Sequence, residues 1–323
     1  MSKLYDGLEK TVLESSMTED EKQSVLKAIL ANKDRKANIM ITGATGSGKS
    51  STINALFNAE KAKVGTGVNP ETMQIKSFQL NNLTLWDSPG LGDGAEKDKK
   101  HAAGIKRKLD EKDENGDLLI DVVLVILDGS GRDLGTSYEL INKVIMPNLQ
   151  DKKRLLVGIN QADVAMKGRY WDSNNHKPLP ELQSFLDEKA KSVRQRIEEG
   201  TGVTIEPVCY SAGYKEEGMP QEPPYNLSKL LYYMIEKIPE EKRIQVIEQI
   251  NPNSEMWKSD DGQKDYRQEV VKSTGNPIIN AFKGAVEGAK AGAKIGENFG
   301  DAGSAVGAAI GAVVGFLGGL FGG

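Results

Sequence analysis

The chain has 323 residues, of which 38% are hydrophobic and 27% charged, which is ordinary for a globular protein of one large or two small domains. Its net charge of −4 offers no bulk positive charge to nucleic acid, so we expect no DNA partner, and charge does not support RNA or ribosome binding. The single cysteine, Cys209, excludes an internal disulfide and fits a reducing compartment. Because the N-terminus has no apolar signal segment, we expect a cytoplasmic protein.

The first 36 residues have the pattern of two amphipathic helices. The second helix begins with a capping box made by Thr18 and Glu21, in which each residue satisfies a backbone N–H at the helix start. Apolar residues then follow at helical spacing, at Val25, Ile29 and Leu30.

Short β-branched runs alternate with helical patterns over residues 37–240. Two of the runs, 120–127 and 153–159, are almost continuously apolar, as expected of parallel strands that are covered by helices on both faces. The pattern predicts an α/β fold of three layers around a mostly parallel six-stranded sheet. Its expected strands are 37–42, 73–80, 83–87, 120–127, 153–160 and 204–210.

The sequence GATGSGKS at 43–50 lies between the first expected strand and a helix. This is the phosphate-binding P-loop pattern, in which glycines let backbone N–H groups surround phosphates, a lysine reaches the outer phosphates and a serine binds Mg²⁺. We expect the nucleotide to contact this loop and the residue after it: Gly43, Thr45, Gly46, Ser47, Gly48, Lys49, Ser50 and Ser51.

Three short motifs follow later strands. Asp87-Ser88-Pro89-Gly90 ends the strand LTLWD, which puts a carboxylate at the metal edge of the site and Gly90 near the outer phosphate. Asn160-Gln161-Ala162-Asp163 ends another strand, where the Asp163 carboxylate can accept hydrogen bonds from N1–H and N2–H₂ of guanine. Ser211 and Ala212 follow the last strand and can offer a backbone N–H to guanine O6. Carboxyl ends of strands meet at one sheet edge, so the motifs predict a shared guanine-nucleotide site.

The series GATGSGKS, DSPG, NQAD and SA resembles the G1, G3, G4 and G5 boxes of translation-factor-related GTPases, nearest the Era-like branch. More narrowly, NQADVAMKGRYWDSNNHKPLPELQSFLDEK and YNLSKLLYYMIEKIPEEKR are similar to a group of bacterial, often prophage-borne GTPases. The resemblance covers about residues 37–243. It implies a Mg²⁺-dependent GTPase that binds GTP and GDP, in which Lys49 neutralises phosphate charge and Gly90 senses the γ-phosphate.

The resemblance also implies a metal site and a switch threonine. Ser50 and a threonine hold Mg²⁺, and Asp87 reaches the metal through water. Thr66 and Thr72 both lie in the segment before the second strand, and we prefer Thr72, as a catalytic and metal-binding residue, because it directly precedes that strand.

The chain departs from this family at two positions. Gln161 replaces the usual lysine, so we expect guanine selectivity to survive with modest affinity. Leu91 follows Gly90, where Ras-type enzymes carry a glutamine that orients water, so we expect slow intrinsic hydrolysis. Arg132 and Arg169 could stabilise transition-state charge, although surface ion pairs are the expected role of each.

The segment 91–117 is expected to be the second switch. Its Lys-rich part, 97–112, is interleaved with acidic residues and should form a solvated face. His101 lies there and could respond to nucleotide state, but we expect it in a solvent-exposed loop.

The tail, residues 276–323, has glycines at a four-residue period from Gly284 to Gly323 with one slip of three, and no charge after Asp301. Small residues one turn apart let another backbone approach closely. Each glycine costs a helix about 1 kcal/mol, so this glycine zipper should need a partner. A membrane, a hairpin docked on the protein or a second copy of the chain would serve, and a disordered low-complexity tail is the alternative.

We therefore expect N-terminal helices at 1–36, a GTPase domain at 37–243, a polar helical linker at 244–275 and the tail at 276–323. The favoured function is a GTPase switch that controls membrane association or oligomerisation through the tail, peripheral to or inserted in the inner face of the cell membrane. The alternative is a soluble Era-like assembly factor acting on a ribosome or an RNA–protein particle.

Overall fold

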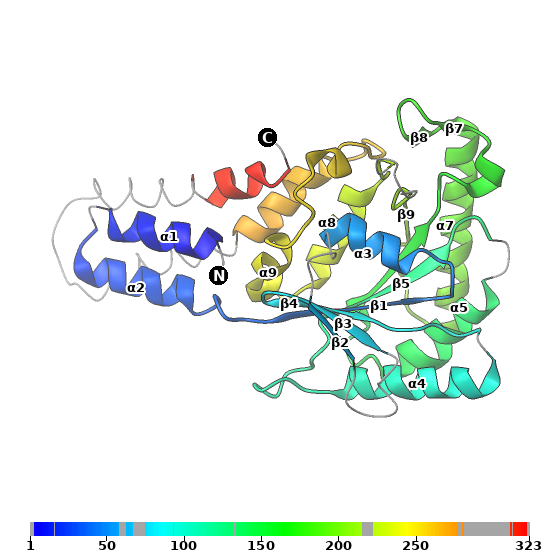
Figure 1. The fold of residues 1–323 in the computed structure, drawn as a ribbon, viewed down its shortest axis with the longest axis horizontal. Helices are drawn as coiled ribbons and strands as arrows, with labels where there is room; N and C mark the ends of the chain where they lie inside the picture. Colours follow the sequence, from blue (N-terminus) through cyan, green and yellow to red (C-terminus); the bar gives the residue numbers. More distant parts are fainter. Residues whose placement is uncertain are drawn as a thin grey trace.

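A seven-stranded sheet with helices on both faces forms the centre of the molecule in this computed structural model (Figure 1). The structure describes residues 3–15, 17–57, 63–66, 75–92, 94–131, 134–214, 222–276, 280, 311 and 313–321. In the order β2-β3-β4-β1-β5-β6-β9, the strands are β2 (Lys63–Thr66), β3 (Lys76–Leu80), β4 (Leu83–Asp87), β1 (Ala37–Gly43), β5 (Val122–Asp128), β6 (Leu155–Asn160) and β9 (Val208–Cys209).

The strands from β4 to β9 pair in parallel, whereas β3 is antiparallel to both β4 and β2. This sheet confirms the expected three-layer α/β fold class, and the short β2 is added to the six expected strands. The last strand is shorter than the predicted range 204–210. Pro207 directly precedes β9, and a proline has no N–H to donate to the β6 ladder.

The two faces of the sheet are covered by different helices. Ile39 and Ile41 of β1 lie in one core with α3 (Lys49–Phe57), α8 (Leu227–Lys237) and α9 (Arg243–Ile247). Met40 lies in the other core, with α4 (Ala95–Asp110), α7 (Pro180–Thr201) and the helical segment α5–η2–α6. Because side chains alternate along β1, both faces of the strand are buried. The motif loops follow the carboxyl ends of the strands and therefore lie at that edge of the sheet. The segment consists of α5 (Gly135–Glu139), the π-helix η2 (Leu140–Ile145) and α6 (Met146–Asn148).

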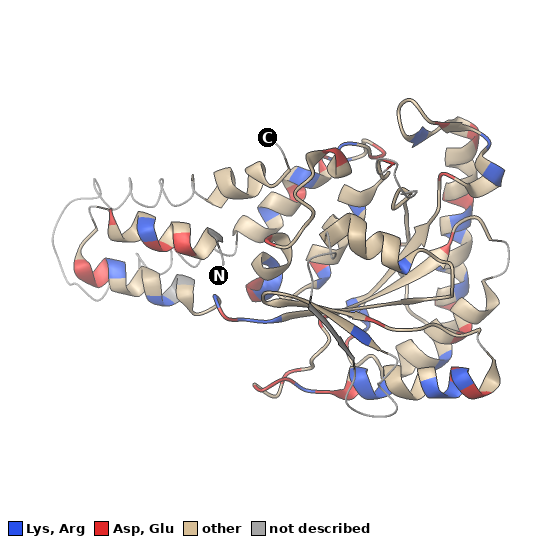
Figure 2. Cartoon of the chain, in the orientation of Figure 1, with Lys and Arg blue, Asp and Glu red and all other residues tan. Residues whose placement is uncertain are grey.

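Smaller elements complete the domain. They are the hairpin β7 (Trp171–Asp172) and β8 (Lys177–Pro178) and the 3₁₀ turns η3 (Lys152–Arg154), η4 (Ala165–Gly168), η5 (Glu240–Lys242) and η6 (Ser254–Trp257). Helices α4 and α7 carry both basic and acidic residues (Figure 2), and in α4 acidic residues lie in the first turn and basic residues in the last.

The N-terminal helices α1 (Lys3–Leu13) and α2 (Glu19–Leu30) pack on each other. The capping box at the start of α2 is confirmed, because the Thr18 hydroxyl accepts from the Glu21 N–H and the Glu21 carboxylate accepts from the Thr18 N–H. The hairpin is also bonded to α9 and the residue after it. The Leu4 N–H donates to the Glu248 carboxylate at 2.9 Å, and the Gln245 amide donates to the Asn32 carbonyl at 2.8 Å.

The stretch expected as a polar linker contributes buried side chains to the same core as α3 and α8. Ile247, Met256, Trp257 and Val270 are all buried there, and residues 266–276 are helical. The boundaries drawn at 243 and 275 stay predictions.

The end of the tail packs on this core too. Residues 313–319 are helical, and Val313, Leu317 and Phe321 are buried, with the Phe321 ring 5.7 Å from the Trp257 ring in an edge-to-face contact. Most of the glycine-periodic segment lies outside the described residues. Within the part of the chain that the structure describes, no helix combines the length and the apolarity needed to span a bilayer.

Candidate functional site

The P-loop connects the end of β1 to the start of α3. Gly46 and Gly48 have φ values of 82° and 89°, in the left-handed region that glycine tolerates. A Cβ on Gly48 would lie 2.1 Å from the side-chain nitrogen of Asn160, so the base-binding motif NQAD lies directly against the P-loop. The loop thus requires glycine both for its backbone conformation and for space.

Lys49 begins α3 and folds its side chain back over the loop. Its Nζ donates to the carbonyl oxygens of Gly43, at 2.9 Å, and Ala44, at 3.1 Å. The ammonium is therefore held at the loop that would surround the phosphates. Ser50 and Ser51, which follow it, are exposed, as is Thr45 in the loop.

The residues around Asp87 fit a Mg²⁺ ion. Asp87 ends β4, its Oδ1 is buried, and among the described residues it has no hydrogen-bond partner. Burial raises the pKa of this carboxyl, and the nearby Lys49 and Lys76 lower it in part. The Asp87 carboxylate oxygen without a donor and the exposed Ser50 hydroxyl at the start of α3 are oxygen ligands of the kind that a hard divalent cation takes.

The preferred switch threonine, Thr72, lies outside the described residues. Thr66 ends β2 and pairs with Lys76 of β3 through the backbone. The choice between the two threonines stays a prediction, as does their metal ligation. Arg132 also lies outside the described residues, and Arg169 is exposed.

The loop after β4 is bonded to the P-loop strand. The Ser88 N–H donates to the Ile41 carbonyl at 2.9 Å, and the Thr42 hydroxyl donates to the Pro89 carbonyl at 3.3 Å. A Cβ on Gly90 would lie 2.4 Å from the Gly43 carbonyl oxygen. Gly90 therefore touches the P-loop through its backbone, which is where a phosphate-sensing glycine is expected.

The base-binding motif is bonded to both the first and the last motif. Asn160 is buried, its side-chain nitrogen donates to the Ser47 carbonyl at 3.0 Å, and its side-chain oxygen accepts from the Ala212 N–H at 3.0 Å. Asp163 follows, half-buried. Since the Ser211 N–H donates to the Tyr225 carbonyl, the predicted contact of Ser211 and Ala212 with guanine O6 stays a prediction.

Gln161 makes contacts that the sequence did not reveal. Its side-chain nitrogen donates to the Gly46 carbonyl at 2.8 Å, and its side-chain oxygen accepts from the Ser130 hydroxyl at 3.1 Å. Ser130 is held in turn by Asp128, the last residue of β5, at 2.7 Å. Gln161 thus connects the P-loop to the loop after β5, a loop for which the sequence pattern predicts no role.

His101 was also misjudged. The expectation of an exposed loop histidine is wrong, because His101 lies on α4, is 6% exposed, and places Nδ1 2.9 Å from the Gly90 carbonyl oxygen. The sequence of α4 gave no sign of this contact, because the contact depends on how α4 packs against the loop after β4.

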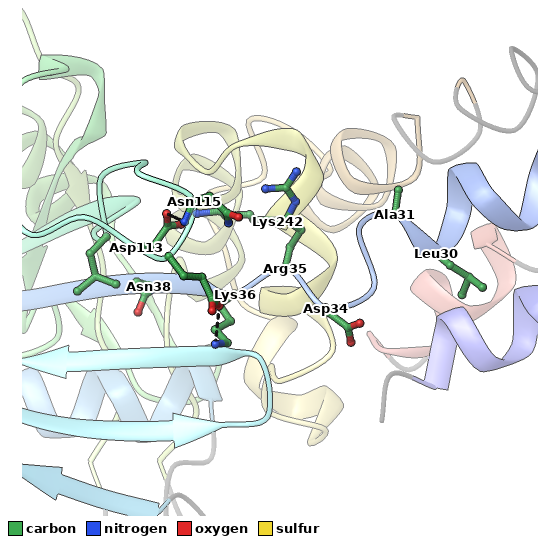
Figure 3. A pocket seen from close by; sticks show the side chains of 11 residues that line it. Leu30, Ala31, Asp34, Arg35, Lys36, Asn38, Asp113, Asn115 and Lys242 are labelled. Carbon is green, nitrogen blue, oxygen red and sulfur yellow. Dashed lines mark hydrogen bonds and ion pairs between the residues drawn. The ribbon is translucent and has the colours of Figure 1, made fainter.

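A separate cavity of about 500 Å³ lies near the amino end of β1 (Figure 3). Lys36 pairs there with Glu114 at 3.0 Å. Beside it, Lys242 and the buried Asp121 pair at 2.9 Å; burial raises the pKa of Asp121, and the Lys242 ammonium lowers it in part. Because the nucleotide motifs lie at the carboxyl ends of the strands, this cavity is not part of their site.

Comparison with known proteins agrees with this geometry. Residues 38–161 match the family model described as 50S ribosome-binding GTPase. The chain is 43% identical over 61 residues to Interferon-inducible GTPase 1 of Mus musculus, covering 17% of this chain and 15% of that protein. It is 31% identical over 131 residues to the uncharacterized protein YfjP of Escherichia coli K12, covering 39% of this chain and 42% of YfjP. The matches thus span less than half the length of these relatives.

Among solved structures, a probable GTP-binding protein engB is similar over 62% of this chain and 98% of its own, at 18% identity and a TM-score of 0.39. Since that score is low, the fold assignment rests on the strand order and the P-loop geometry described above. Residues 38–161 of the chain are therefore similar to a GTPase domain.

Proposed function

We propose that the whole chain is a guanine-nucleotide switch, in which GTP or GDP occupies the loops at the carboxyl edge of the sheet. One observation carries the proposal. The buried Asn160 side chain bonds to Ser47 of the P-loop and to Ala212 of the last motif, so three nucleotide-contacting loops are held by one amide. Asp163, three residues later, would then accept from guanine N1–H and N2–H₂.

In this proposal the phosphates lie in the P-loop, where Lys49 neutralises charge on their outer oxygens and Gly90 reports on the γ-phosphate. Ser50, Asp87 and a switch threonine, Thr72, would hold Mg²⁺. The ion, when bound, supplies charge stabilisation for the departing phosphate. Hydrolysis is slow, because Leu91 packs partly into the core beside α4 and leucine cannot orient water.

The proposed output is the C-terminal tail, and a chain of contacts runs from the P-loop helix to the end of it. The Asn251 N–H donates to the Leu56 carbonyl at the end of α3, at 2.7 Å. The Trp257 ring N–H donates to the Asn251 carbonyl at 2.9 Å, and the Trp257 ring contacts Phe321. A shift of α3 on nucleotide exchange would therefore reach the site on which the tail end packs.

We infer that the tail end leaves this site in one nucleotide state, which frees residues 276–323 to associate with the inner face of the cell membrane or with a second copy of the chain. A series of contacts between two sites does not by itself show that the sites are energetically coupled. The dependence of tail release on the bound nucleotide therefore has to be measured. Membrane association and oligomerisation are parts of this proposal, as is the placement of the chain in the Era-like branch.

A second candidate is a soluble assembly-factor GTPase that acts on a ribosome or an RNA–protein particle. The description of the matching family model favours it. The net charge of −4 does not favour it, because RNA binding commonly uses a basic surface.

Co-sedimentation with anionic liposomes tests the proposal, with the full chain in GDP and in a non-hydrolysable GTP analogue. We expect one nucleotide to favour pelleting, and a chain truncated after Asn276 to stay in solution in both. Equal pelleting of the truncated chain would exclude the tail as the anchor. No pelleting of the full chain in either nucleotide, together with nucleotide-dependent pelleting with ribosomal subunits, would move the second candidate to the front.

A further inference from the structure

We propose that His101 is the positioning residue that couples the phosphate-sensing loop at Gly90 to helix α4. The inference rests on the proposed function, because it assumes that the chain has two nucleotide states.

The hydrogen bond between His101 and Gly90 can have only one direction. The Gly90 carbonyl oxygen can only accept a hydrogen bond, so His101 Nδ1, 2.9 Å away, carries a proton and donates it. The ring is buried on α4, which shields the bond from competition with water. His101 therefore fixes the orientation of the Gly90–Leu91 peptide from below.

Gly90 has no freedom on its other side. Its backbone lies against the Gly43 carbonyl and the Ala44 nitrogen of the P-loop so closely that a Cβ would clash with both. A ligand oxygen that attracts the Gly90 N–H moves the Pro89–Gly90 peptide, and because Gly90 lies between the P-loop and the His101 ring, this movement turns the adjoining Gly90–Leu91 peptide, whose carbonyl is bonded to His101. The displacement is then passed to α4 through the imidazole.

Two more contacts join α4 to the same loop and strand. The Gly92 N–H donates to the Asp98 carboxylate at 3.0 Å, in the first turns of α4. At the other end of the helix, the Lys108 ammonium lies 4.0 Å above the ring of Trp86, the residue before Asp87. Of these three contacts of α4, the His101 bond is the one made to the Gly90 carbonyl itself, so it is the contact through which that carbonyl acts on the helix.

A matched pair of variants tests the role. His101→Asn keeps a side-chain N–H near the position of Nδ1, whereas His101→Leu has nearly the shape of asparagine and no donor. The readout is hydrogen exchange of the α4 amides, residues 95–110, in the full chain with GDP and with a non-hydrolysable GTP analogue, together with kcat and KM for GTP.

In the wild-type chain, we expect α4 exchange to differ between the two nucleotides. His101→Leu should lose most of this difference and lower kcat about tenfold, with KM changed less than about threefold. His101→Asn should recover most of both. A lower kcat at a nearly unchanged KM is expected if His101 has a positioning role, whereas a general loss of the fold would impair both constants.

The outcomes also separate the two proposals. If wild-type α4 exchanges equally in both nucleotides, the switch fails and the coupling fails with it. If the wild type shows the difference and His101→Leu keeps it, the coupling is wrong while the switch stands.

A measurement on the unaltered chain covers the case in which the variants do not fold. The protein has two histidines, His101 and His176, so ¹H–¹⁵N correlation of the imidazoles resolves both, and His176→Gln assigns them. We expect a proton on Nδ1 of His101 in the GDP state. A neutral ring with its proton on Nε2 alone would overturn the proposal.

Discussion

The side-chain nitrogen of Asn160 lies 3.0 Å from the carbonyl oxygen of Ser47, and the oxygen of the same amide lies 3.0 Å from the nitrogen of Ala212. A single buried amide thus fixes the P-loop and the last motif with respect to each other. Both partners are backbone groups, so the contact depends on loop conformation and not on the identity of Ser47 or Ala212.

Replacing Asn160 with alanine should therefore damage nucleotide binding and stability together. The buried Ser47 carbonyl and Ala212 N–H would each lose a partner, at about 1–3 kcal/mol apiece. We expect the affinity for GDP to fall at least about 100-fold, measured by titration with a fluorescent GDP. Asn174→Ala, in an exposed turn, should leave both quantities unchanged; an Asn160→Ala chain with near-native affinity would contradict this account of the site.

Asp163→Asn should move the base preference from guanine towards xanthine. The carboxylate accepts two hydrogen bonds from guanine, and charged hydrogen bonds contribute about 1.5–3 kcal/mol each, so GTP affinity should fall about 100-fold while xanthosine triphosphate binding appears. Competition titrations with both nucleotides measure the switch. Unchanged GTP affinity would remove Asp163 from base recognition.

Gln161→Leu should speed the release of nucleotide. It removes the bonds to Gly46 and Ser130 and leaves a branched apolar side chain of similar size, so the P-loop loses its connection to the loop after β5. We expect GDP dissociation to accelerate about tenfold in a stopped-flow chase, which corresponds to about 1.4 kcal/mol and lies within the range for two lost hydrogen bonds of about 0.5–1.5 kcal/mol each. Gln195→Leu, on the exposed side of α7, serves as the control, and an equal rate in both variants would show that Gln161 does not hold the loop.

Asp87→Asn should stabilise the Mg²⁺-free chain and abolish the effect of Mg²⁺ on nucleotide binding. Burial raises the pKa of Asp87 in the folded state, so the folded protein binds more protons than the unfolded chain. Its contribution to stability therefore falls as the pH rises from the ordinary aspartate range through the raised pKa.

Thermal unfolding in EDTA between pH 4 and 8 checks this sign. The asparagine variant should have the higher midpoint at neutral pH, and the gap should close towards acid pH. A wild-type chain that is the more stable of the two at neutral pH without Mg²⁺ would contradict the assignment of Asp87 as an uncompensated buried carboxylate.

Phe321→Ala should release the tail end from the core. Burying a phenylalanine contributes about 1.5–3 kcal/mol, and the ring is buried against Trp257. We expect faster hydrogen exchange over 313–321 and liposome binding that no longer depends on nucleotide. Val314→Ala is the control, because Val314 lies on the same helix at 48% exposure; equal effects from both variants would mean that the docked ring does not retain the tail.

The fold class and the motif order could be predicted from the sequence because both depend on local patterns. Continuous apolar runs fix strands such as 122–128, and a strand followed by GxxxxGKS fixes a P-loop. The short edge strand β2 has few apolar positions and no clear pattern, whereas the shortening of β9 follows from Pro207, which the predicted range 204–210 ran across.

The parts of the site that escaped prediction are long-range contacts. The bond from His101 to Gly90 depends on how α4 turns under the loop, and the bonds of Gln161 depend on a turn set by Asp128. The packing of Phe321 on Trp257 joins residues 64 positions apart, and no periodicity in the tail encodes its partner. The spacing of the motifs predicts which chemistry is present. The packing of these side chains decides which motifs and helices contact one another.

Hydrogen exchange of the tail end is the most direct measurement of the central claim, that the nucleotide in the P-loop controls the docking of the tail. The full chain would be compared in GDP and in a non-hydrolysable GTP analogue, without liposomes, and residues 313–321 would be followed alongside the buried strand β5 as an internal reference. We predict that the tail end exchanges faster in one of the two nucleotides while β5 does not change. Equal exchange of the tail end in both nucleotides, at saturating binding, would contradict the claim.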